Sequence, residues 1–144
     1  MAGAHLAREP LVAASDRLRI GARALVLRVR LASMLRRRSL PELLASLTPA
    51  SLEPRPVPLV EEALSTSEAV IERLRVVPDT CLYRSLTRYA ALRRAGHPAR
   101  FVMAVQPRDP SISGHAWVEL HGEPVGETVD PDLAVTFAYP HERP

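Results

Sequence analysis

The sequence has only one cysteine and no lysine, so all nineteen of its basic residues are arginine. A single cysteine excludes an internal disulfide bond, and it cannot build a cysteine-based zinc site on its own. A chain without disulfides suits a reducing compartment, so we expect the protein in the cytoplasm. At 144 residues the chain is long enough for one domain with a hydrophobic core and a small appendage.

No stretch of the sequence has the pattern of a secretion signal or a membrane span. Residues 1–10 lack the succession of basic, apolar and cleavage regions that makes up a signal peptide. Residues 18–35 are rich in apolar side chains, but four arginines interrupt the run, which excludes a helix that spans a bilayer. Contact with a membrane is therefore not expected.

Positive charge is concentrated in the N-terminal part of the chain. Residues 1–40 hold nine arginines and two acidic residues, whereas the other 104 residues hold ten arginines and fourteen acidic residues. A basic segment is compatible with nucleic acid, a membrane surface or an acidic peptide as a partner. We favour a simpler interpretation, in which the arginines form two exposed faces of a helix. Nucleic acid is not expected as a partner, because no aromatic residues interleave with these arginines.

The first part of the chain is predicted to be helical after a loosely ordered start at residues 1–15. Two apolar stripes at three-to-four spacing run through residues 16–37 and indicate a helix that is packed on both sides. The stripes consist of Leu18, Ala22, Leu25, Val29 and Ala32, and of Ile20, Ala24, Leu27 and Leu31. A helix that lies on a membrane surface is not favoured, because it would show one apolar face.

A capping box indicates a second, shorter helix. The hydroxyl of Ser39 can accept a hydrogen bond from the amide of Glu42, and the carboxylate of Glu42 can accept one from the amide of Ser39. The helix that follows is expected to end near Leu47. Prolines are frequent after that point, which favours an extended chain. We therefore assign residues 1–50 to an N-terminal helical segment and residues 51–58 to a proline-rich linker.

Residues 59–144 are predicted to form the main domain, which begins with two helices. An apolar face over residues 59–75 indicates the first helix. The second helix starts at Cys81, with Asp79 or Thr80 as its cap.

Three short segments with strand character follow these helices. They lie at residues 100–106, 115–120 and 125–130, and a tight turn at residues 121–122 joins the last two. Helices that precede an antiparallel sheet are typical of the α+β class. We therefore predict N-terminal helices followed by a core in which a helix packs on a small antiparallel sheet.

The two best candidates for chemistry are Cys81 and His115. Cys81 opens a helix, where unpaired amides and the positive end of the helix dipole favour the thiolate, which is the nucleophilic form. His115 begins a strand after a loop that contains glycine, and alternation places it on one face with Trp117 and Glu119. Considered alone, the cysteine also fits a small core residue. Together and in this order, the two residues resemble the arrangement of papain-like thiol enzymes.

An acid is needed as a third residue, to orient the imidazole and stabilise its charge. Glu119 follows the histidine on the same strand and is a poor candidate. On the next strand, alternation places Glu127 and Asp130 on opposite faces, and a two-residue turn leaves Asp130 diagonal to His115. One β-bulge would reverse that assignment, so the pattern leaves both acids open.

Three motifs in this part of the chain resemble those of the transglutaminase-like leader peptidases of bacterial lasso-peptide biosynthesis. They are Cys-Leu-Tyr-Arg-Ser-Leu at 81–86, Arg-Arg-Ala-Gly-His-Pro at 93–98, and His-Ala-Trp-Val-Glu-Leu-His-Gly-Glu-Pro-Val-Gly-Glu at 115–127. The resemblance covers about residues 58–137 and implies a transglutaminase/papain-like core with a Cys-His-Asp triad. The acid of that triad falls about twelve residues after the histidine, where this sequence has Glu127 instead of aspartate. We assign Cys81, His115 and Glu127 as catalytic residues and keep Asp130 as the reserve acid.

The same resemblance implies a function and partners. The substrate would be a ribosomally synthesised precursor peptide, which a cysteine peptidase cuts between leader and core without a metal or another cofactor. Some family members carry a fused leader-recognition domain, and we see no segment with room for one here, so we expect a separate leader-recognition protein. An ATP-dependent macrolactam cyclase would act downstream. Two alternatives share the fold: a transamidase, in which an amine captures the thioester, and a non-hydrolytic peptide-binding chaperone.

Overall fold

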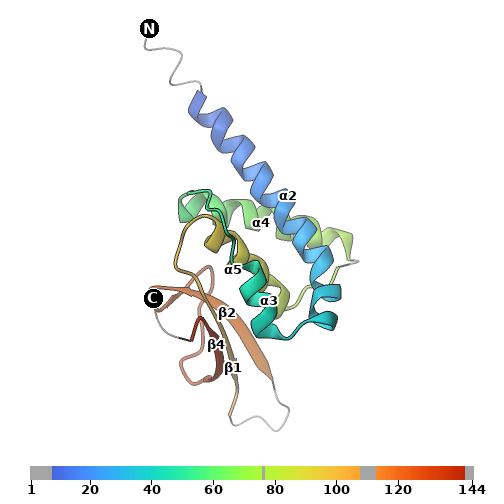
Figure 1. The fold of residues 1–144 in the computed structure, drawn as a ribbon, viewed down its shortest axis with the longest axis vertical. Coiled ribbons are helices and arrows are strands. Elements are labelled where there is room, and N and C mark those ends of the chain that lie inside the picture. The colour runs from blue at the N-terminus through green and yellow to red at the C-terminus, as the bar shows by residue number, and fades with distance from the viewer. Residues whose placement is uncertain (1–7, 76, 108–112, 142–144) are drawn as a thin grey trace.

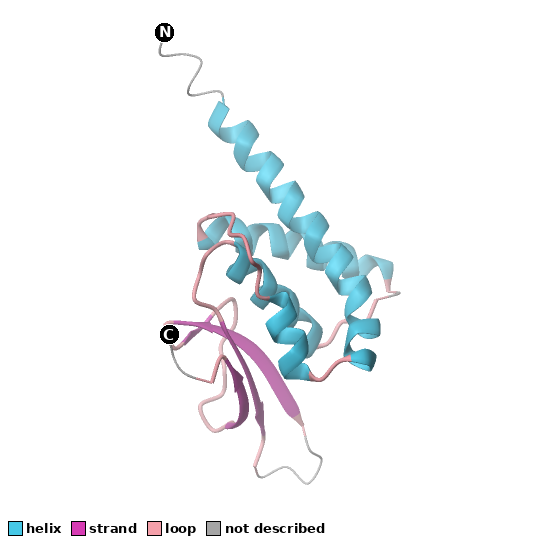
Figure 2. Cartoon of the chain, in the orientation of Figure 1, coloured by secondary structure: helices cyan, strands magenta, loops and turns pink. Residues whose placement is uncertain are grey.

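The computed structural model describes residues 8–75, 77–107 and 113–141, and it confirms the predicted α+β class (Figure 1; Figure 2). Within these ranges, four helices precede a four-stranded antiparallel sheet of order β3-β2-β1-β4. The elements are α2 (Arg8–Arg37), α3 (Leu40–Leu47), α4 (Val57–Leu74), α5 (Cys81–Arg94), β1 (Arg100–Val105), β2 (Gly114–Leu120), β3 (Glu123–Pro124) and β4 (Ala134–Tyr139). Helix α5 is central, because it contacts the other three helices and also strands β1 and β2.

Helix α2 is longer than the sequence pattern predicts. It begins at Arg8, so the expectation of a loosely ordered start is wrong for residues 8–15, and residues 1–7 lie outside the described ranges. Pro10 is compatible with this early start, because proline is tolerated in the first turn of a helix. The N-terminal part of α2 projects beyond the rest of the molecule (Figure 1). No helix in the described part of the chain has both the length and the apolar content needed to cross a membrane.

Only one of the two apolar stripes predicted for α2 is packed. Ala24 and Leu31 are buried in the core that α2 shares with α4 and α5. Leu18 and Val29 of the other stripe are 76% and 65% exposed, so the prediction of a helix packed on both sides is wrong. The physical reason is that the neighbouring helices cover a single side of α2, and the second stripe remains open to solvent.

Helix α3 begins and ends as predicted. The amide of Ser39 donates to the carboxylate of Glu42 at 2.9 Å, as part of a capping box. Leu43 and Leu44 are buried in the main core. The chain from residue 52 to residue 56 has no regular secondary structure, and α4 then starts with a proline in its first turn.

Helix α5 packs its apolar face on the sheet. Leu86, Tyr89 and Leu92 of this helix are buried in the main core, together with Phe101 of β1 and Val118 of β2. The opposite face of the sheet carries a second, smaller core, which consists of Val102, Ala104, Trp117 and Ala138. The two faces of β2 therefore alternate as the sequence predicts.

The sheet confirms two predicted strands and corrects a third. Strands β1 and β2 pair antiparallel, and a turn occupies residues 121–122. The strand predicted over residues 125–130 is wrong, because β3 ends at Pro124 and Gly126 adopts a φ of 74°, which a strand cannot contain. Strand β4, which the sequence pattern does not predict, pairs with the other edge of β1.

Candidate active site

Cys81 is the first residue of α5 and is half-buried against the main core. Thr80 is the N-cap with an extended backbone, and its carbonyl accepts the amide of Arg84 at 3.0 Å. The side chain of Thr80 makes no capping hydrogen bond, so it leaves the amides of the first turn available. A thiol at this position lies next to free N–H groups and the positive end of the helix dipole, and both favour an anion.

A buried hydrogen bond fixes this end of α5 against β2. The hydroxyl of Ser85 donates to the carbonyl oxygen of Ala116 at 2.7 Å, and both residues are buried. Ser85 lies one helical turn after Cys81, and Ala116 directly follows His115. The bond therefore connects the turn that follows the candidate nucleophile to the residue that follows the candidate base.

A second contact shows that α5 and β2 run in the same direction. The ring of Tyr89, one turn further along α5, lies edge-on to Tyr139 with centroids 6.2 Å apart. Tyr139 pairs with Phe101, which pairs with Val118 on β2. Four helical residues rise about 6 Å and two strand residues about 6.6 Å, so each turn of α5 matches two residues of β2.

This match brings Cys81 and His115 to the same end of the molecule. One turn before Ser85 on α5 corresponds to two residues before Ala116 on β2, and Cys81 is thus level with Gly114. Alternation turns the imidazole of His115 toward the sheet face away from α5. In the described ranges, no hydrogen bond joins this ring to the thiol.

The structure brings His115 and Glu127 together. Nε2 of the histidine and Oε2 of the glutamate are 2.5 Å apart, and the two side chains are 34% and 25% exposed. A carboxylate only accepts, so Nε2 carries the hydrogen and Nδ1 is left to exchange a proton. The catalytic roles of these residues stay predictions, but their arrangement is that of a base with its orienting acid.

The conformation of Gly126 explains why Glu127, and not Asp130, reaches the histidine. The amide of Val125 donates to the carbonyl of Val118 at 2.9 Å, which is the pairing that the two-residue turn predicts. The positive φ of Gly126 then breaks the alternation. Asp130 is exposed, and its carboxylate accepts the amide of the residue two positions later at 2.9 Å.

An ion pair on the helices supports the loop at Gly126. Arg88 of α5 and Glu61 of α4 form this pair at 3.0 Å. A Cβ atom on Gly126 would lie 2.7 Å from Nη2 of Arg88 and 2.8 Å from Oε2 of Glu61. A side chain at this position would require the tips of Arg88 and Glu61 to move, and the positive φ of Gly126 also favours glycine there.

Trp117 stacks on the candidate base. Its ring and that of His115 are 5.8 Å apart with an interplanar angle of 19°. The indole N–H donates to Glu119 at 3.1 Å, so the tryptophan is itself held in place. The sequence predicts the common face of these three residues, and the structure confirms it.

Sequence reasoning missed a buried charge network beneath the start of α5. Arg28 of α2 is fully buried and donates to Glu68 at 2.6 Å and to Asp79 at 3.1 Å, while its Nε has no partner among the described residues. Arg84 adds two further bonds of 2.7 Å to Asp79. These bonds from Arg84 lower the pKa of Asp79, and the nearby charge of Arg28 lowers it further. The network anchors the chain two residues before Cys81.

A signal for this network was present in the sequence. Arg28 lies four residues after Ala24 and three before Leu31, which places it on the packed stripe of α2. An arginine at such a position has to find an acidic partner when the helix packs. The prediction that the arginines of this helix lie on exposed faces is therefore wrong for Arg28.

The chain was also compared with known proteins. The family model of the transglutaminase-like superfamily matches residues 22–138. No curated protein and no solved structure matches the chain. The family match includes the candidate nucleophile, base and acid, and it covers most of the sequence. The chain therefore belongs to the transglutaminase-like superfamily, which includes cysteine peptidases and transamidases.

Proposed function

We propose that this protein is a cysteine peptidase that removes the leader from a ribosomally synthesised lasso-peptide precursor, together with a separate leader-recognition protein. One observation carries the proposal: His115 is hydrogen-bonded to Glu127 at the end of β2 that lies level with Cys81. Membership of the transglutaminase-like superfamily supports the reaction class. The motifs at 81–86 and 115–127 favour the lasso-peptide branch.

The first half of the reaction forms a thioester. The Sγ–H proton of Cys81 moves to Nδ1 of His115, whose Nε2–H keeps donating to the Glu127 carboxylate, and the thiolate attacks the carbonyl carbon at the leader–core junction. Amides in the first turn of α5 donate to the developing oxyanion, where one well-aimed donor contributes about 3 kcal/mol. The imidazolium then gives its Nδ1 proton to the departing amine of the core peptide. The leader remains attached to Cys81.

The second half of the reaction releases the leader. A water molecule gives a proton to Nδ1 of His115, and the resulting hydroxide adds to the thioester carbon. The C–S bond breaks, the leader leaves with a new carboxyl group, and the sulfur takes the proton back from the ring. Glu127 stays ionised and stabilises the imidazolium in both halves. If an amine replaces the water, the same thioester yields an amide, which is the transamidase alternative.

This scheme requires the thiol and the imidazole to come together when the substrate binds. Catalytic hydrogen bonds are often long in the absence of substrate and shorten when the substrate binds. Gly114 is exposed and has no side chain that could separate Cys81 from the ring of His115.

The decisive experiment follows the precursor by mass spectrometry. The precursor is incubated with this protein, with and without the leader-recognition protein, and Cys81→Ala is compared with wild type. Wild type is expected to release leader and core whose summed mass exceeds that of the precursor by one water, and Cys81→Ala is expected to release neither. A Cys81→Ala variant that still cleaves would contradict the mechanism. An amine adduct would indicate a transamidase, and binding without turnover would indicate a chaperone.

The same assay identifies the acid. Glu127→Gln keeps the shape of the side chain but removes its charge, and it is expected to lower kcat/KM by about a thousandfold. Asp130→Asn is the matched control, because its carboxylate is engaged within its own loop, and it should stay within about twofold of wild type. The opposite result would assign the role to Asp130.

A further inference from the structure

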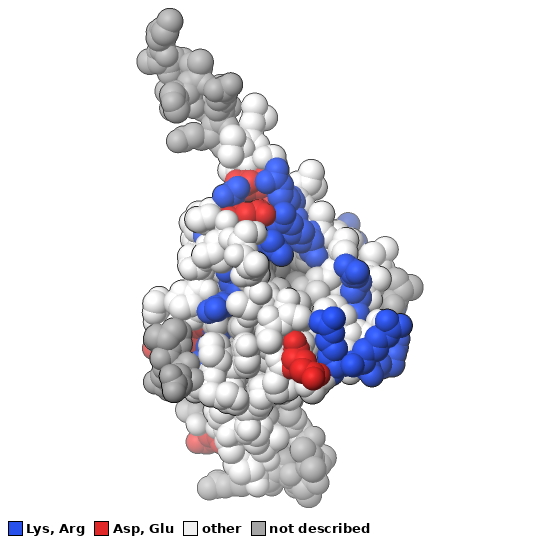
Figure 3. Space-filling view, in the orientation of Figure 1, with Lys and Arg blue, Asp and Glu red and all other residues white. Residues whose placement is uncertain are grey.

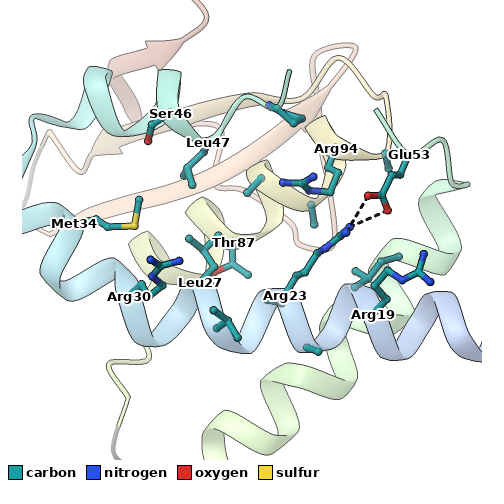
Figure 4. Close-up of a pocket in the computed structure, with 18 of the residues that line it drawn as sticks. Arg19, Arg23, Leu27, Arg30, Met34, Ser46, Leu47, Glu53, Thr87 and Arg94 are labelled. Carbon is teal, nitrogen blue, oxygen red and sulfur yellow. Dashed lines mark hydrogen bonds and ion pairs between the residues drawn. The ribbon is translucent and has the colours of Figure 1, made fainter. Parts of the chain in front are cut away.

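A groove of about 860 Å³ lies between α2 and the neighbouring helices α3 and α5, on the side of α5 away from the sheet (Figure 4). Its apolar lining includes Ile20, Leu27 and Met34 of α2, Leu47 of α3, and Ala90 and Ala91 of α5. The proposed reaction uses none of these residues. The groove therefore calls for a separate explanation.

The groove carries a positive charge that the described residues do not fully neutralise. Seven arginines and two acidic residues line it. Arg23 pairs with Glu53 through bonds of 2.8 and 2.9 Å, and Arg55 pairs with Asp16 at 2.7 Å. In the described part of the chain, the other five make no ion pair: Arg19, Arg30, Arg37, Arg38 and Arg94. Figure 3 shows arginines gathered along α2, with few acidic side chains beside them.

The groove side of α2 has a seven-residue repeat. The apolar members are Ile20, Leu27 and Met34, and each is followed three residues later by an arginine, namely Arg23, Arg30 and Arg37. Alternating spacings of three and four residues produce the stripe along which a second helix packs. The repeat spans about 26 Å, which is the length of a partner helix of about five turns.

We propose that this groove is a docking site for an acidic amphipathic helix of a partner protein. Apolar residues of that helix would cover Ile20, Leu27 and Met34, and its carboxylates would pair with Arg30, Arg37 and the other unpaired arginines. This is the helix-in-groove mode of recognition, with charge complementarity selecting the partner. A second copy of this chain fits poorly, because it would bring the same arginines against one another.

Two other classes of partner fit the lining less well. No residue that lines the groove is aromatic, so single-stranded nucleic acid would find no platform for its bases. A membrane surface binds apolar faces that protrude into it, whereas these apolar residues line a hollow between helices. A helix that presents both leucines and glutamates can cover the apolar residues of the groove and pair with its arginines.

The test uses a designed probe and the full-length protein. The probe is a fluorescein-labelled peptide of about three heptads, with leucines on one face and glutamates on the others. It should bind in a complex of one peptide to one protein, gain helix by circular dichroism and weaken as salt is added. A peptide with glutamine in place of every glutamate should bind at least about tenfold more weakly.

Matched double variants locate the binding site. Arg30→Gln with Arg37→Gln removes two arginines of the groove and should weaken binding about tenfold or more. Arg36→Gln with Arg73→Gln removes two exposed arginines that do not line the groove, and it should leave binding within about twofold. Because binding needs no turnover, Cys81→Ala should bind like wild type, which keeps this test separate from the proposed function.

Several results would overturn the proposal. They are the absence of peptide binding, equal binding of the glutamine peptide, and equal losses in the two double variants. Tighter binding of about twenty linked thymidines, or of phosphatidylserine vesicles, with the same dependence on Arg30 and Arg37 would assign the groove to nucleic acid or to a membrane. A dimer in sedimentation that the same two substitutions dissociate would assign it to a second copy.

Discussion

The buried charge network beneath the candidate site and the arginine groove use the same helix in different ways. Arg28 and Arg23 lie about one and a half turns apart on α2, and each pairs with a glutamate. Arg28 is fully buried and bonds to both Glu68 and Asp79, below the chain that enters α5. Arg23 bonds to Glu53 beside the groove, and 44% of its side chain is exposed. The ion pairs of Arg28 hold the structure near the candidate nucleophile, whereas the ion pair of Arg23 lies at the surface.

The difference lies in how much water each pair has lost. A charge that is paired in the interior cannot be left alone there, because solvent does not reach it to replace the partner. An exposed pair is screened and replaced by water at little cost. Arginines on one helix therefore contribute differently to the stability of the fold, and the buried ones contribute more.

Replacing Arg28 should have the largest effect. Arg28→Met leaves Glu68 without its closest cation and Asp79 with one partner fewer, so the free energy of unfolding should fall by about 3 to 5 kcal/mol. Urea denaturation followed by circular dichroism measures this change. A loss below about 1 kcal/mol would mean that the buried pair stabilises no more than a surface pair.

An intermediate effect is expected from acid. The hydrogen bonds from Arg84 lower the pKa of Asp79 in the folded state, so the folded protein binds fewer protons than the unfolded chain. The resulting stability is complete above the ordinary pKa of the carboxyl group and is lost as the pH falls through the lowered value, below about pH 4.

Asp79→Asn tests this dependence. Urea midpoints measured between about pH 2 and pH 6 should depend less on pH in this variant than in wild type. Asp132→Asn serves as the control, because this exposed loop residue forms no ion pair with any described residue. If Asp79→Asn and wild type lose stability in parallel, the pairing with Arg84 has no part in acid unfolding.

The smallest effect should come from Arg23. Arg23→Met removes the same charge from the same helix as Arg28→Met, yet the unfolding free energy should change by less than about 1 kcal/mol. The two variants are best measured side by side in urea. Equal losses would show that the exposed pair contributes as much to stability as the buried network, and the contrast between the two regions would disappear.

Patterns of a few adjacent residues in the sequence predicted those elements whose bounds are set by interactions between near neighbours in the chain. The start of α5 at Cys81 follows from the cap and the proline before it, and the alternation of β2 follows from its own apolar positions. The turn at residues 121–122 was likewise visible. These features are set by interactions a few residues apart, which a sequence displays directly.

Features that depend on distant segments were not predicted. Regular alternation placed Asp130 diagonal to His115, whereas the family resemblance indicated Glu127. The structure pairs Glu127 with His115, because the positive φ of Gly126 breaks the alternation. Gly126 itself lies beside an ion pair between α4 and α5. The exposed stripe of α2 was assigned a packing partner that the fold does not provide. Strand β4 was missed because it pairs with β1, more than thirty residues earlier in the chain.

The close approach of Gly126 to Arg88 and Glu61 also has a consequence for the length of the side chain that follows it. The Glu127 carboxylate reaches the imidazole from a loop whose backbone lies beside the tips of those two side chains. Aspartate has one methylene fewer and would fall short by about 1.5 Å. An aspartate at position 127 would therefore reach the imidazole only if the loop lay closer to His115.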